Sequence, residues 1–194
     1  MKSHTLMAIG TVAFLMGCGG PPPRVYVLGA ASDARPGVTS EDTRPVVELT
    51  RVTVPDYLDT TDISRHDGRN GIVTSRSGRW GERLSVGVAR ALATALDQIV
   101  PSIRIARIAL SSRPGRVLLV EVETLEARAN GQCVLTANWT VLTDDRRSIV
   151  TSGRGTFVTQ IPDGPEDAAV VAAVGGAVEK LARPIAAALT RPAR

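Results

Sequence analysis

Residues 117–161 read VLLVEVETLEARANGQCVLTANWTVLTDDRRSIVTSGRGTFVTQI, and this segment consists of three runs rich in β-branched residues. The runs are Val117–Arg128, Cys133–Leu142 and Ser148–Ile161. The joints between them are short: Asn130-Gly131 and a polar turn over 143–147. Such joints predict consecutive antiparallel hairpins. Alternation in the middle run predicts one buried face, made of Cys133, Leu135, Ala137, Trp139 and Val141.

Two amphipathic segments complete this core. Between residues 84 and 99, the apolar positions recur at helical spacing and end before Pro101. A second helix is predicted over Glu166–Leu189, with acidic residues near its start, which suits the helix dipole. Further strands are expected at Arg24–Leu28, Val46–Val54 and Ile103–Leu110, with hairpin signals between 56 and 78. The fold class is therefore α/β, with α+β left open: one domain, residues 25–190, with a mixed and mostly antiparallel sheet packed against two helices.

The amino-acid composition limits which classes of partner the protein can bind. The chain has 194 residues, a net charge of +4 and only 3% aromatic residues. Its basic residues are scattered singly, apart from the pair Arg146-Arg147, so there is neither a basic block nor an aromatic stacking platform. We therefore expect no nucleic-acid binding.

The N-terminal segment has the pattern of an export signal. One lysine precedes an uncharged apolar run over 5–16, which is too short to span a bilayer but typical of a signal peptide. The run ends in Leu15-Met16-Gly17-Cys18, which resembles the lipobox of bacterial lipoproteins. This predicts a signal peptide over 1–17, acylation of Cys18 and a stiff, proline-rich tether over 18–24. Three acyl chains would give stable anchoring.

The chain offers little for catalysis. It contains no nucleophile elbow, zincin motif, Cys-x-x-Cys, P-loop or dinucleotide fingerprint. His66 would be the one histidine left after export, in a polar loop, and Cys133 is expected to be a buried, inert thiol. We predict a protein that is not an enzyme, with no cofactor, no metal site and no catalytic residue.

Four segments of the chain carry a family resemblance. In chain order, the segments are Val52-Thr53-Val54-Pro55-Asp56-Tyr57-Leu58-Asp59, Ile63-Ser64-Arg65, Arg79-Trp80-Gly81-Glu82-Arg83-Leu84, and the strand with Leu135, Ala137, Trp139 and Val141. This order resembles the ABC-type transport auxiliary lipoproteins, the PqiC-like partners of MCE lipid-transport systems. The resemblance covers most of residues 24–190. Thr60, Ser64, Gly81 and Arg83 depart from the family pattern.

The resemblance implies a lipid-anchored subunit on the periplasmic face of the outer membrane, bound to an MCE-domain protein and able to form homo-oligomers. Its candidate partner-binding residues are Tyr57, Leu58, Arg65, Arg79 and Trp80. For Leu58 and Trp80, a purely structural role remains an alternative. Two other functions stay open: an outer-membrane assembly or envelope-integrity lipoprotein of another complex, and a periplasmic hydrolase that uses His66.

Overall fold

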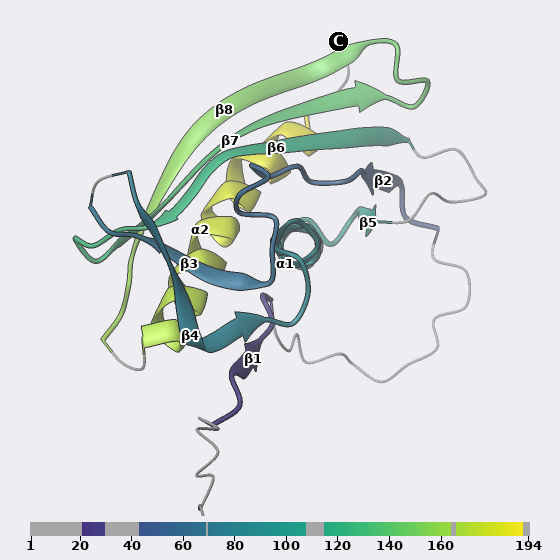
Figure 1. The fold of residues 1–194 in the computed structure, drawn as a ribbon. Coiled ribbons are helices and arrows are strands. Elements are labelled where there is room, and N and C mark those ends of the chain that lie inside the picture. The colour runs from purple at the N-terminus through teal and green to yellow at the C-terminus, as the bar shows by residue number, and fades with distance from the viewer. Residues whose placement is uncertain (1–20, 30–42, 69, 108–114, 164–165, 192–194) are drawn as a thin grey trace, which may run out of the picture.

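The computed structural model describes residues 21–29, 43–68, 70–107, 115–163 and 166–191 (Figure 1). Within them, eight strands and two helices follow one another along the chain. Their bounds are β1 Arg24–Tyr26, β2 Val46–Leu49, β3 Asp62–His66, β4 Ile72–Trp80, α1 Leu84–Ile99, β5 Arg104–Ala106, β6 Arg116–Ala127, β7 Gln132–Thr143, β8 Ile149–Gln160 and α2 Glu166–Leu189. Both helices match their predicted ranges.

The predicted α/β class is confirmed, but the strands form two sheets where we expected one. The larger sheet has the order β5-β2-β6-β7-β8, and the smaller has the order β1-β4-β3. The antiparallel β6-β7-β8 meander is as predicted. The parallel pairs of β2 with β5 and β6, and of β1 with β4, join segments far apart in the chain. Local sequence patterns do not encode such pairings.

Some expected strand boundaries are wrong. Only Val46–Leu49 of the run 46–54 forms a strand, followed by one isolated bridge at Thr53. The hairpin expected between 56 and 78 is confirmed as the antiparallel pair of β3 and β4, but its strands are longer than the short apolar pair predicted, and β4 continues to Trp80. Of the strand expected at Ile103–Leu110, β5 accounts for three residues, and 108–110 lie outside the described part.

The core lies between the larger sheet and the helices. Figure 1 shows α2 running along the concave side of β6, β7 and β8, with α1 between α2 and the β2–β5 side. The predicted inner face of β7 is confirmed, because all five of its residues are buried. Trp139 covers Gly153 on the paired strand β8, where no larger residue would leave room for the indole.

The predicted signal segment 1–17 and Cys18 lie outside the described residues. The described chain begins at Pro21, three residues before β1, and Pro21, Pro22 and Pro23 are exposed. Among the described helices, none is both long and apolar enough to cross a membrane.

Candidate functional site

Two of the segments that carry the resemblance meet at the start of α1. The loop 55–61 follows β2, and the junction 79–84 connects β4 to α1. Their backbones are joined by hydrogen bonds: the Trp80 N–H donates to the Thr61 carbonyl at 2.8 Å, and the Leu84 N–H donates to the Thr60 carbonyl at 3.2 Å. Segments about 20 residues apart in the chain thus form one structural unit.

Asp59 is the centre of this unit. Its side chain is only 6% exposed, and its Oδ1 accepts a hydrogen bond from the Ser85 backbone N–H at 3.0 Å. The N-cap residue of α1 is Arg83, which makes no side-chain capping bond, and the first turn contains no acidic residue. A carboxylate from the preceding loop therefore supplies the cap and the negative charge that favour a helix N-terminus.

Arginines complete the environment of Asp59. Arg83 donates through Nε to Asp59 Oδ2 at 3.2 Å, and the Arg51 Nη2 lies 3.7 Å from the same oxygen. Burial of the carboxyl raises its pKa, but the hydrogen bonds from Ser85 and the charge of Arg83 outweigh burial. The pKa of Asp59 consequently lies below its ordinary value, so the group is ionised at neutral pH.

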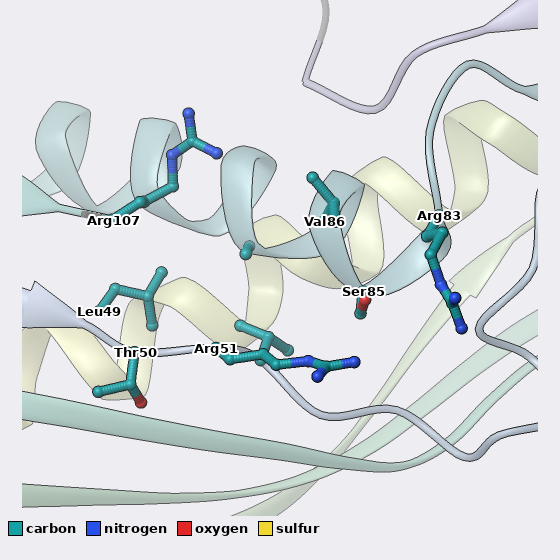
Figure 2. A pocket seen from close by; sticks show the side chains of 9 residues that line it. Leu49, Thr50, Arg51, Arg83, Ser85, Val86 and Arg107 are labelled. Carbon is teal, nitrogen blue, oxygen red and sulfur yellow. The ribbon is translucent and has the colours of Figure 1, made fainter. Parts of the chain in front are cut away.

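A cleft of about 330 Å³ opens beside this cap, between α1 and the chain that follows β2 (Figure 2). Its described lining includes three arginines and no acidic residue. Apolar side chains form much of the remaining wall. The lining residues are Leu49, Thr50, Arg51, Val52, Arg83, Ser85, Val86, Ala89 and Arg107.

The five predicted partner-binding residues do not form one surface. Tyr57 is 48% exposed, and Arg79 is exposed on β4. Leu58 and Trp80 are buried in the hydrophobic core, each 6% exposed. Arg65 pairs with Glu166 and donates through Nη2 to the Glu166 carbonyl at 2.9 Å, so it ties β3 to the start of α2.

A second, polar cleft of about 570 Å³ lies at the tip of the β3–β4 hairpin. His66 lines it, with Nε2 3.7 Å from Glu126 Oε1. Its described lining contains no serine, threonine or cysteine that His66 could activate as a base. No group of three possible metal ligands occurs among the described residues. The arrangement therefore offers binding surfaces and shows no nucleophile beside the histidine.

The expected burial of Cys133 is confirmed. The side chain is fully buried on β7, and burial raises the pKa of its thiol to about 11, against the opposing effect of a hydrogen bond with Thr159. A thiol with that pKa carries almost no thiolate at neutral pH.

Sequence reasoning missed Arg51, Arg83 and Arg107 as a group, and it gave Asp59 no role. One signal was available: Arg83 precedes the helical pattern at Leu84 where Ser, Thr, Asp or Asn would be expected. A helix start without a local cap indicates that an acceptor comes from elsewhere in the chain. The pattern could not say which residue supplies it.

The chain matches the family described as ABC-type transport auxiliary lipoprotein component over residues 26–186. Among solved structures, an uncharacterized protein superposes with a TM-score of 0.70 at 17% identity, covering 87% of this chain and 99% of the other. Protein XCC0632 from Xanthomonas campestris gives a TM-score of 0.64 at 16% identity, covering 84% and 91%. These superpositions show a shared fold. Comparison with curated proteins finds no match.

Proposed function

Since the chain belongs to the family of ABC-type transport auxiliary lipoprotein components, we propose that it is the lipid-anchored periplasmic subunit of an MCE-type lipid-transport system. In this function it binds the MCE-domain protein and holds it at the inner leaflet of the outer membrane. The observation that carries the proposal is the family match over 26–186, which spans nearly all of the described domain.

The proposed anchor sets where the domain sits. Acylated Cys18 would be six residues from Arg24, where β1 begins. Six extended residues reach about 20 Å, and exposed prolines stiffen half of this tether. The domain would therefore stay within about 20 Å of the bilayer surface, close enough to receive the end of a protein that crosses the periplasm.

Within this function, we propose that Tyr57 and Arg79 contact the partner. Both are exposed, and a tyrosine provides a large contact area at small entropic cost. Leu58 and Trp80 would act from beneath, Leu58 by fixing the loop that presents Tyr57 and Trp80 by fixing the strand end that presents Arg79. Arg65 would hold the neighbouring strand β3 against α2 through Glu166.

Self-association is part of the proposal. β8 has twelve residues and is an edge strand of the larger sheet. A long unpaired edge is a template for pairing with another chain. Light scattering of the purified lipoprotein would show a mass several times that of one chain, whereas a monomer at physiological concentrations would contradict this element alone.

The test is co-purification of the full-length lipoprotein from solubilised membranes of its native host. We expect an MCE-domain protein to be recovered with the wild-type chain, and much less with a Tyr57→Ala/Arg79→Ala double variant that keeps its melting temperature. A Cys18→Ser variant should leave the outer-membrane fraction. Recovery of a different assembly complex, with no MCE protein, would instead support the envelope-integrity function and refute the proposal.

A further inference from the structure

The cleft beside α1 has an uneven charge balance. Arg51, Arg83 and Arg107 line it, and Asp59 is the acidic group that holds two of them. Asp59 is buried, and its two oxygens already accept from Ser85 and Arg83. Each guanidinium has five N–H donors, so most donors remain directed to solvent or to a ligand. The described lining and its carboxylate together leave a net charge of +2 at the cleft.

The positively charged side chains lie at the two ends of the cleft, with apolar surface between them. Figure 2 shows the guanidinium groups of Arg51 and Arg83 toward one end and that of Arg107 toward the other, with Val86 between them. Val86 is 44% exposed and lines the cleft, so its side chain offers apolar surface to a ligand. A ligand that suits this wall carries two separated anionic groups and a small apolar part between them.

Past β2, the described backbone beside the cleft is hydrogen-bonded to β6 on one side. β5 pairs with β2 only across Val46–Glu48, while the chain beyond stays bonded to β6: Thr50 N–H donates to the Leu118 carbonyl, and Thr53 N–H donates to that of Val120, each at 3.1 Å. Arg51 is exposed and makes no backbone hydrogen bond with any other described residue, whereas the neighbouring Val52 is 0% exposed. An exposed peptide group without a backbone partner can pair with an added segment.

We infer that this cleft binds an extended acidic segment of the partner protein, with carboxylates at the Arg51/Arg83 end and the Arg107 end and a small apolar side chain against Val86. The inference rests on the proposed function, because it names the chemistry of the partner that the domain binds. An anionic lipid headgroup would satisfy the Arg51/Arg83 end of the cleft but would leave the Arg107 end unused.

The test measures binding of fluorescein-labelled peptides to the detergent-solubilised full-length lipoprotein by anisotropy. The probes are capped Val/Thr peptides in which Asp and Glu are separated by two, four or six residues, and matched peptides with Asn and Gln. We expect at least one acidic peptide to bind, its amide counterpart to bind much less, and affinity to fall with added salt. Arg51→Ala and Arg107→Ala should each weaken binding about tenfold, as expected for one charge-assisted hydrogen-bonding partner.

The control variant is Arg183→Ala, which removes an exposed arginine from α2 and should leave peptide affinity unchanged. Arg83 is not used, because its loss would also disturb the cap of α1. Failure of all acidic peptides to bind would overturn the inference. So would arginine-dependent binding of phosphatidylglycerol vesicles that the peptides do not compete for. If Arg51→Ala and Arg107→Ala still recover the MCE protein at wild-type levels, the cleft assignment fails while the proposed function stands.

Discussion

Replacing Asp59 tests how the start of α1 is held. Asp59→Ala removes the acceptor of the Ser85 backbone N–H, which lies at 3.0 Å in a buried position, and removes the partner of Arg83. Loss of a helix cap costs about 1 kcal/mol, with a range of about 0.5–2 kcal/mol. Arg83 is 63% exposed, so its screened ion pair adds only about 0.5 kcal/mol. The free energy of unfolding should fall by about 2 kcal/mol, allowing for the N–H left without an acceptor.

The measurement is thermal and urea unfolding of the wild-type chain, Asp59→Ala, Asp59→Asn and Asp56→Ala. A loss of about 2 kcal/mol corresponds to a melting temperature lowered by about 4–8 °C in a domain of this size. Asp59→Asn keeps an oxygen for the Ser85 N–H and should lose about half as much. Asp56 is an exposed carboxylate in the same loop, so its replacement should change stability by less than about 0.5 kcal/mol.

The pH dependence gives an independent check. The pKa of Asp59 is lowered in the folded state, so the unfolded chain binds its proton more readily, and this carboxylate stabilises the fold above its ordinary pKa of about 4. That contribution should disappear as the pH falls through the lower folded pKa. The stability difference between wild type and Asp59→Asn should therefore shrink on acidification. Equal stability of Asp59→Ala and Asp56→Ala, or a difference that is constant down to acidic pH, would refute the capping role.

Three further substitutions or probes check other parts of the structure. Leu58→Ala should cost about 2–4 kcal/mol by leaving a cavity, and Tyr57→Ala less than about 1 kcal/mol, as read from urea midpoints; equal losses would mean that Tyr57 is also a core residue. Cys133, whose thiol pKa is raised to about 11, should resist a thiol reagent at pH 8 until denaturant is added, in a variant without the N-terminal cysteine; rapid labelling of the native protein would contradict its burial. Gly153→Ala would place a β-carbon against the Trp139 ring and should cost about 1–3 kcal/mol in calorimetry; an unchanged melting temperature would show that the indole can move.

The parts of the fold that could be predicted are those with a local physical cause. The β6–β8 meander follows from alternation and short turns, and α1 and α2 follow from helical periodicity bounded by Pro101 and by the acidic start of α2. The division into two sheets could not be predicted. It depends on parallel pairs such as Val25 with Arg79 and Val47 with Arg116, whose partners are more than 50 residues apart. Nothing within a short window distinguishes one such partner from another.

The candidate site shows the same limit. A Tyr-Leu pair after Pro55 predicted an exposed loop, but alternation does not hold in irregular backbone, so the pattern could not separate exposed Tyr57 from buried Leu58. The sequence leaves a structural role open for Trp80, but whether its ring faces the core depends on β1 and β3 packing beside β4. The sequence pattern could not predict the arginine cleft, because Arg51 and Arg107 lie far apart in the chain and each resembles any other scattered arginine.

The positions of these residues distinguish the buried residues of the motif from the arginines of the cleft. Leu58, Asp59 and Trp80, three of the residues that carry the resemblance, are all buried and hold the loop 55–61 against the start of α1. Their replacement should act first on stability, and on partner binding only through the loss of a rigid surface. Arg51 and Arg107 cap no helix, so their replacement can change which partner is bound while the fold is kept. A chain with this motif intact but different charges at 51 and 107 should fold alike and select a different partner segment.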